Sequence, residues 1–212
     1  IQEALQRIQS RQAPGSPPGS QADDGRYRNA PVGRIRRSTD HPGDSESTHG
    51  VVIEFDQNAL RNAGLIAPDH HEQLLADQYR DIKRPLIANA LGRRAAKVDD
   101  GNLIMISSAI SGEGKTFTSI NLAISIAQEK DLEVLLIDAD VAKPHISTVL
   151  GVSEMTGLLD ILEDKDGILS PEKMVVPTDI AGLSVLPAGI PRAHATELLS
   201  SFKMENLVKR LA

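Results

Sequence analysis

The chain has 212 residues, a formal net charge of −6, only 2% aromatic residues and no cysteine. This length allows one domain with a tail or two small domains. The absence of cysteine excludes disulfides, thiolate metal sites and cysteine nucleophiles, and the acidic balance argues against nucleic-acid binding as the main role. No apolar run approaches the ~20 residues that cross a bilayer, and no signal peptide is recognisable, so we expect a cytoplasmic protein. Because the sequence begins without Met, we expect it to start inside a longer reading frame.

Residues 1–50 are expected to form a disordered or linker arm that starts with a short amphipathic helix over residues 1–8. After that helix the composition changes to Pro, Gly, Ser, Asp and Arg, and almost nothing apolar remains to bury. The entropy cost of ordering such a backbone would be uncompensated. The arginines of this arm can be solvated, or they can contact acidic lipid head groups or a partner.

Residues 51–98 are expected to form a helical extension that opens with a short extended segment. Asp56 can cap a brief helix, because its carboxylate can accept a hydrogen bond from a first-turn amide. A longer helix follows, and Pro85 should kink or end it. Apolar residues in that helix recur at helical spacing: Leu75, Tyr79 and Ile82.

Residues 99–212 alternate apolar strands with helices, the pattern of an α/β fold with a parallel sheet and right-handed crossovers. The expected strands cover 103–107, 133–137 and 183–186, and the expected helices cover 115–128, 146–150, 157–162, 196–200 and 202–211. In such a fold the last helix should lead into a further parallel strand. We therefore expect a P-loop NTPase-type sheet with flanking helices that is truncated at its C-terminus.

A phosphate-binding loop lies between the first expected strand and the helix after it. The pattern G-x-x-x-x-G-K-[ST] falls on residues 109–116, with Ala109 where the first Gly is commonest. Backbone amides would surround the phosphates, Lys115 would bridge the β- and γ-phosphates, and the hydroxyl of Thr116 would coordinate Mg²⁺. A glycine-rich turn with a coincidental Lys-Thr pair is the alternative. The expected nucleotide-binding residues are Ser111, Gly112, Glu113, Gly114, Lys115, Thr116 and Phe117.

Two aspartates, Asp138 and Asp140, end the second expected strand. In an open parallel sheet, ligands bind at the carboxyl ends of strands, so both carboxylates should lie beside the phosphates. One could hold Mg²⁺ and the other could accept a proton from an attacking nucleophile. The alternative is a strand-to-loop turn that happens to be rich in Asp.

The segments Ser-Ala-Ile-Ser-Gly-Glu-Gly-Lys-Thr (108–116) and Leu-Leu-Ile-Asp-Ala-Asp-Val-Ala-Lys-Pro-His (135–145) resemble the bacterial tyrosine kinases (BY-kinases) of exopolysaccharide and capsule assembly. The similarity is greatest to their exosortase-associated branch. The resemblance implies an ATP-dependent protein-tyrosine autokinase with ATP and Mg²⁺ as ligands. It assigns catalysis to Lys115, Asp138 and Asp140, with Asp138 as the candidate base, and metal binding to Thr116 and Asp140.

The resemblance also implies partners. The family carries an E-x-x-R-x-x-R helix that packs kinase subunits into a ring, and the matching positions here are Asp77, Arg80 and Lys83. Asp is shorter than Glu, and Lys lacks the bidentate fork of Arg, so an ordinary solvated helix face is the alternative. A separate membrane polysaccharide co-polymerase subunit is the implied activator, which would place the protein peripherally at the inner face of the plasma membrane.

A partitioning or cell-division-type ATPase switch is the second hypothesis. Those proteins usually carry another Lys near the start of the loop, where this chain has Ala109 and Ile110. A regulatory subunit that binds nucleotide without turnover is the third. No strand with a Walker B aspartate follows residue 186, and the tyrosine-rich tail of the family is missing, so we expect residues 1–212 alone to have little phosphoryl-transfer activity.

Overall fold

The computed structural model describes residues 33–37, 51–66, 72–93, 98–110 and 112–212. The helix expected over residues 1–8 lies outside these ranges. The N-terminal elements are β1 (Gly33–Arg37), β2 (Val51–Phe55), α2 (Gln57–Asn62), α3 (Glu72–Ala90) and α4 (Lys115–Ala127). The C-terminal elements are β3 (Val134–Ile137), α5 (His145–Val149), α6 (Leu158–Glu163), α7 (Pro171–Met174), β4 (Val176–Pro177), β5 (Leu183–Leu186), α8 (Ala195–Leu199) and α9 (Phe202–Leu211).

The central sheet has the strand order β3-β5-β4. Strands β3 and β5 are parallel and in register from Val134 opposite Leu183 to Ile137 opposite Leu186. The short edge strand β4, which the sequence did not predict, pairs with β5 in the antiparallel direction. The expected α/β fold with a parallel pair and flanking helices is confirmed.

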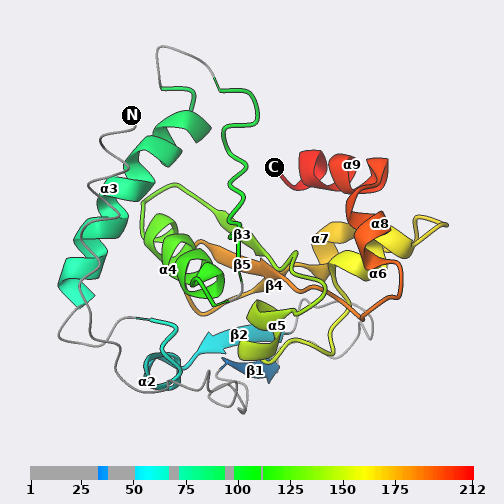
Figure 1. Ribbon diagram of the computed structural model, residues 1–212, viewed down its shortest axis with the longest axis horizontal. Coiled ribbons are helices and arrows are strands. Elements are labelled where there is room, and N and C mark those ends of the chain that lie inside the picture. Colours follow the sequence, from blue (N-terminus) through cyan, green and yellow to red (C-terminus); the bar gives the residue numbers. More distant parts are fainter. Residues whose placement is uncertain (1–32, 38–50, 67–71, 94–97, 111) are drawn as a thin grey trace, which may run out of the picture.

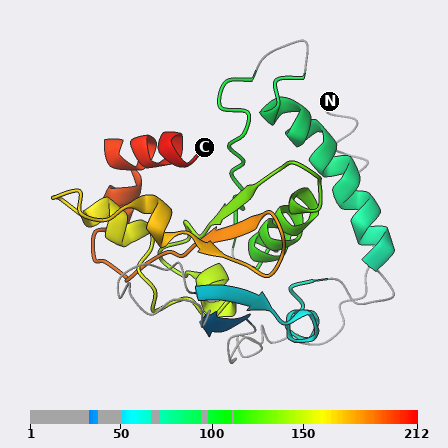
Figure 2. The ribbon, with the colours of Figure 1, turned by 180° about the vertical axis from the view of Figure 1, so that it is seen from behind.

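Helices cover both faces of this sheet, with α4 on one side and α6, α7, α8 and α9 on the other (Figures 1 and 2). Alternate residues of β3 pack into the hydrophobic cores on opposite faces of the sheet. Leu136 joins a core with Ile120 of α4, whereas Leu135 and Ile137 pack against a second core that contains Leu158 of α6. This alternation is what a strand with two buried faces requires, because successive side chains point to opposite faces.

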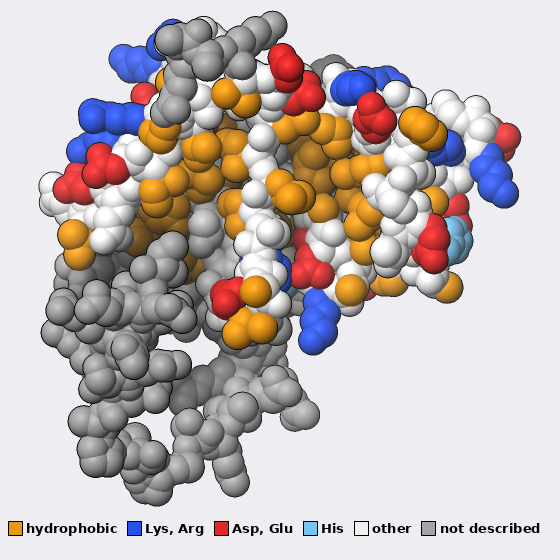
Figure 3. Space-filling model, turned by 45° about the horizontal axis from the view of Figure 1, so that its top comes forward, with side chains coloured by type: hydrophobic (Ala, Val, Ile, Leu, Met, Phe, Trp, Pro, Cys, Tyr) orange, Lys and Arg blue, Asp and Glu red, His pale blue; other side chains and the backbone are white. Residues whose placement is uncertain are grey.

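The strand expected over residues 103–107 is not formed. The segment runs without regular secondary structure, and within the part of the chain that the structure describes no strand pairs with it. Most of its apolar side chains are open to solvent: Met105 is 88% exposed, and Leu103 and Ile104 are more than 40% exposed, whereas Ile106 is partly buried. Hydrophobic side chains gather over a broad part of one face of the molecule (Figure 3). An apolar run forms a strand only if a neighbouring strand pairs with its backbone N–H and C=O groups, and no described strand does so here.

Part of the expected disordered arm is ordered, which corrects the prediction for residues 33–37. Strand β1 pairs antiparallel with β2, with Ile35 opposite Ile53. Asp179 joins β2 to the central sheet through two hydrogen bonds. Its amide donates to the Ile53 carbonyl at 2.9 Å, and its carboxylate accepts from the Phe55 amide at 3.0 Å. Partnering with β2 stabilises a segment that has too little apolar surface to order by itself. The rest of residues 1–50 lies outside the described ranges.

Helix α3 packs beside α4 (Figure 1) and continues through Pro85 to Ala90. Of the two predicted effects of Pro85, ending the helix is therefore wrong, and a kink stays a prediction. Proline removes only one backbone donor, and Leu86 and Ile87 pack on a core shared with α4, which holds the helix together beyond it. The buried face also differs from the prediction. Tyr79 is 6% exposed as expected, but Ile82 is 49% exposed.

Lys83 occupies the buried position instead of Ile82, and only 6% of its surface is exposed. Its ammonium donates to the carbonyl of Ser125 at 2.6 Å and lies 2.9 Å from the carboxylate of Glu129, both near the end of α4. Residues four apart stack along one stripe of a helix, so position 83 continues the line from Tyr79. Lys83 therefore joins α3 to α4 within one chain.

Candidate nucleotide-binding site

The phosphate loop enters α4 through two glycines with left-handed backbone. Gly112 has φ 90° and Gly114 has φ 91°, a region that residues with a Cβ rarely adopt. The carboxylate of Glu113 accepts from the amides of Ala109 and Ile110 at 2.9 and 3.2 Å, which closes the loop on itself. Ser111 lies outside the described residues. The loop thus has the bend that the sequence predicts.

Helix α4 presents a bare N-terminus at the end of this loop. Its N-cap is Gly114, which supplies no side-chain hydrogen bond, and the first turn carries no acidic residue. The amides of Lys115, Thr116 and Phe117 belong to the first turn, where no intrahelical acceptor exists. These donors and the partial positive charge of the helix end form a site suited to phosphate oxygens.

Lys115 and Asp140 bring the two predicted motifs together. The Lys115 ammonium lies 3.9 Å from a carboxylate oxygen of Asp140, although the residues are 25 positions apart. Both side chains are partly exposed, at 35% and 44%. A pair this open contributes little to stability, so both groups remain available to a ligand.

Asp138, by contrast, is 1% exposed. One carboxylate oxygen, Oδ2, accepts from the amide and the hydroxyl of Ser147 at 2.8 and 2.7 Å, whereas Oδ1 accepts, among the described residues, only from the Asp140 amide at 3.3 Å. Burial raises the pKa of the Asp138 carboxyl above its ordinary value, and the hydrogen bonds from Ser147 oppose that rise. The structure places both aspartates after β3, one buried and one open.

Two residues of α5 reach the site without having been assigned a role from the sequence. Ser147 holds Asp138, and Nδ1 of His145 lies 3.2 Å from the hydroxyl of Thr116. The only sequence signal was their position, seven and nine residues after Asp138, in a short helix that begins at His145. The direction in which α5 returns to the loop could not be read from that spacing.

The residues present fit a Mg²⁺ ion that is shared with a nucleotide. Thr116 supplies a hydroxyl oxygen and Asp140 a carboxylate oxygen, the hard donors that Mg²⁺ prefers. Among the described residues there is no group of three or more His, Asp or Glu side chains that could hold a metal. Phosphate oxygens and water would therefore complete the coordination, as is usual for Mg²⁺ in nucleotide sites.

Comparison with known proteins agrees with this geometry. Residues 104–202 match the family model of the CobQ/CobB/MinD/ParA nucleotide binding domain. The tyrosine-protein kinase YwqD of Bacillus subtilis is 36% identical over 157 residues, which cover 74% of this chain and 62% of that protein. The tyrosine-protein kinase wzc of Salmonella typhi is 38% identical over 107 residues, which cover 50% of this chain and 14% of that protein. The kinase domain of Escherichia coli tyrosine kinase ETK superposes with a TM-score of 0.53 at 28% identity, covering 64% of this chain and 49% of that domain.

This chain spans less than two thirds of the length of each of these relatives. The predicted resemblance to bacterial tyrosine kinases is confirmed, whereas the narrower assignment to the exosortase-associated branch stays a prediction. Among the described residues, no helix has the length and apolar character needed to cross a membrane. In its nucleotide-binding domain and in its sequence, the chain is similar to the bacterial tyrosine-protein kinases.

Proposed function

We propose that this chain is the nucleotide-binding part of an ATP-dependent protein-tyrosine autokinase that regulates exopolysaccharide biosynthesis and export. The observation that carries the proposal is the approach of Lys115 to Asp140 at 3.9 Å beside the bare N-terminus of α4. It brings the cation that we propose to bind phosphate and the carboxylate that we propose to bind the metal to the same end of the sheet. The printed names of the relatives, tyrosine-protein kinases, support the reaction type.

In this proposal the residues act by positioning and by charge neutralisation. The amides of residues 114–117 bind the phosphates of ATP, and Lys115 moves from Asp140 to the β- and γ-phosphate oxygens. Thr116 and Asp140 would hold Mg²⁺, which would neutralise part of the developing negative charge. Burial raises the pKa of the Asp138 carboxyl, so its carboxylate is a stronger base for the proton of a tyrosine hydroxyl than an ordinary aspartate. Its Oδ1, which accepts the long 3.3 Å hydrogen bond from the Asp140 amide, is the oxygen proposed to accept that proton.

Self-association through α3 is proposed with a smaller contact than the sequence predicted. Asp77 and Arg80 form an exposed ion pair at 2.7 Å, so both can face another subunit. Lys83 is buried against α4 and is not part of this proposed contact. A membrane co-polymerase subunit remains the proposed activator, with the protein held peripherally at the inner face of the plasma membrane.

Incubation of the complete gene product with labelled ATP and Mg²⁺ tests the reaction. A tyrosine kinase transfers label to tyrosine, and the variant Lys115→Ala abolishes that transfer. The matched control is Lys165→Ala, an exposed lysine between α6 and α7, which should retain full labelling. Release of free phosphate without labelled tyrosine would contradict the kinase and point to an ATPase switch. Neither product, in the presence of the co-polymerase, would contradict both.

A further inference from the structure

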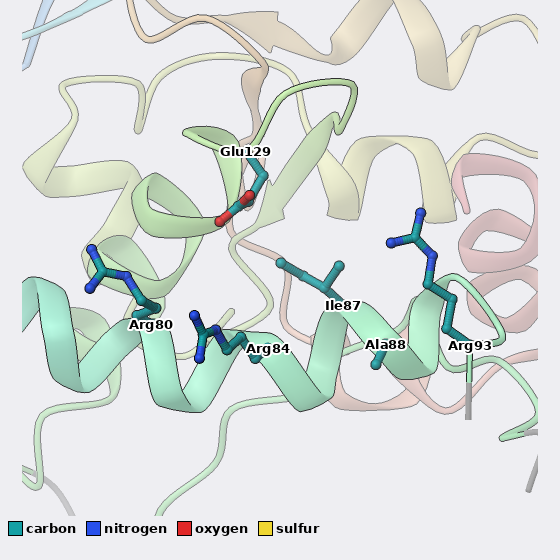
Figure 4. Close-up of a pocket in the computed structure, with 6 residues that line it drawn as sticks. All are labelled: Arg80, Arg84, Ile87, Ala88, Arg93 and Glu129. Atoms are coloured by element: carbon teal, nitrogen blue, oxygen red, sulfur yellow. The ribbon is translucent and has the colours of Figure 1, made fainter. Parts of the chain in front are cut away.

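A basic cleft lies away from the phosphate loop, between α3 and the turn that ends α4. It has a volume of about 340 Å³. Figure 4 shows the side chains that line it: Arg80, Arg84, Ile87, Ala88, Arg93 and Glu129. The mechanism proposed above uses none of these side chains for nucleotide binding.

The backbone of α3 and the turn after it place three guanidinium groups around this cleft. Arg80 and Arg84 are one helical turn apart and therefore lie on the same face. Beyond the end of α3, Gly92 has φ 62°, and the amide of Arg93 donates back to the carbonyl of Ala88 at 2.9 Å. That turn brings Arg93 to the opposite side of Ile87 from the other two arginines (Figure 4).

Positive charge dominates the cleft, because its nearby carboxylates are already paired. Asp77 binds Arg80 at 2.7 Å, and Glu129 is bound by the buried ammonium of Lys83 at 2.9 Å. Over the stretches of chain that the structure describes, Arg84 and Arg93 have no ion-pair partner, and both side chains are exposed. Lys83 lowers the pKa of Glu129 most, and Arg84 and Arg80 add smaller Coulombic effects. The guanidinium groups of Arg84 and Arg93 are exposed and can bind an added anion.

The lining selects among anions by shape as well as by charge. Guanidinium groups offer pairs of parallel N–H donors that match phosphate oxygens, which makes arginine clusters the usual receptors for phosphorylated side chains. The side chain of Ile87 forms an apolar wall between Arg84 and Arg93 (Figure 4), against which an aromatic ring can pack. An inorganic phosphate or a phosphoserine would leave that wall uncovered. A phosphotyrosyl side chain would use both the charge and the wall.

We propose that this cleft binds a phosphotyrosyl side chain, with the phosphate held by Arg84 and Arg93 and the ring packed on Ile87. The choice of phosphotyrosine rests on the proposed function, since this is the product of a tyrosine autokinase. The cleft would then recognise the phosphorylated form of a protein segment at a surface separate from the site of transfer.

Binding of synthetic peptides to the 212-residue chain, followed by fluorescence anisotropy, tests this proposal. The probe is an acidic peptide with one phosphotyrosine, compared with the same peptide carrying tyrosine or phosphoserine and with inorganic phosphate as competitor. We expect the phosphotyrosine peptide to bind at least about tenfold more tightly than the other two. Arg84→Gln combined with Arg93→Gln should remove that preference. Both substitutions are on exposed side chains, so the fold should be retained, as checked by circular dichroism.

Two control variants separate this site from others. Lys165→Gln removes an exposed cation elsewhere and should leave peptide binding unchanged. Lys115→Ala alters the phosphate loop and should also leave it unchanged, which excludes binding of the phosphotyrosine at the nucleotide site. Equal affinity for the three peptides, full competition by inorganic phosphate, or unchanged binding in the folded double variant would each overturn the proposal. Because synthetic peptides need no kinase activity, this result and the labelling result above can fail independently.

Discussion

Ser147 donates two hydrogen bonds to the buried carboxylate of Asp138, from its hydroxyl at 2.7 Å and from its amide at 2.8 Å. The same hydroxyl accepts from the amide of Ala188 at 3.0 Å. One serine of α5 therefore connects the end of β3 with the turn that follows β5. The position of the candidate base depends on this connection.

Replacing Ser147 by Ala should destabilise the protein. The substitution removes one hydrogen bond to the Asp138 carboxylate and leaves the Ala188 amide without its acceptor, each in a buried setting. Loss of such partners costs about 1–3 kcal/mol in the free energy of unfolding, measurable by urea denaturation. Ser200→Ala, at an exposed serine near the end of α8, should change the value by less than about 0.5 kcal/mol. Equal stability of the two variants would show that the Ser147 hydroxyl does not hold Asp138.

Replacing Lys83 by Met should loosen α3 from α4. Methionine keeps an apolar stem but removes the donor to the Ser125 carbonyl and the ion pair with Glu129. We expect a loss of about 1–3 kcal/mol in the free energy of unfolding. Amide hydrogen exchange should become faster in α3. The control is Lys130→Met, at the exposed residue next to Glu129, which should leave the free energy of unfolding nearly unchanged. Unchanged exchange in α3 would contradict the bridging role of Lys83.

Glu172 makes the packing of α7 on α9 sensitive to acid. Its carboxylate accepts from the hydroxyl of Ser170 and from the guanidinium of Arg210. Three hydrogen bonds lower the pKa of Glu172 to about 2. The hydroxyl of Ser170 has the largest effect, followed by the backbone amide of Glu172 and the guanidinium of Arg210. A carboxyl with a lowered pKa in the folded state stabilises the fold above its unfolded pKa of 4.5. That contribution is lost as the pH falls from there toward 2.

The variant Glu172→Gln should therefore be less stable than the parent protein at about pH 6, with the difference shrinking toward zero near pH 2. The pair is half exposed, so we expect the difference to stay below about 1 kcal/mol. Urea denaturation of both proteins across this pH range measures it. Glu154→Gln, at another exposed glutamate, should differ from the parent by less than about 0.5 kcal/mol near pH 6. A Glu172→Gln difference that grew on acidification would contradict this origin of the stability.

Local sequence signals predicted the elements that depend on local chemistry. Glycines at 112 and 114 and the helix that begins at Lys115 were predictable because the loop needs a left-handed backbone and the helix buries a regular stripe. Asp56 likewise caps α2, with its carboxylate accepting from the Ala59 amide at 3.0 Å as expected. The residues that form each of these features lie within a few positions of one another, so the local sequence is enough to predict them.

Features that depend on distant partners were not predictable. Residues 103–107 have the composition of a buried strand but lack a neighbouring strand in the described structure. The choice of Lys83 over Ile82 for the interior depends on the Ser125 carbonyl and Glu129, which lie more than forty residues away. For the same reason, the contacts of His145 with Thr116 and of Ser147 with Asp138 appear only once α5 is placed beside the loop.

Isothermal titration of ATP into the complete gene product, with Mg²⁺ present, tests the nucleotide site most directly. We expect saturable binding that Lys115→Ala weakens by at least about tenfold, because the ammonium contacts the phosphates in the proposed complex. Lys165→Ala should bind as the parent protein does. Absence of binding by the folded parent protein, or equal affinity in the Lys115→Ala variant, would contradict a phosphate site formed by the loop before α4 and closed by Lys115.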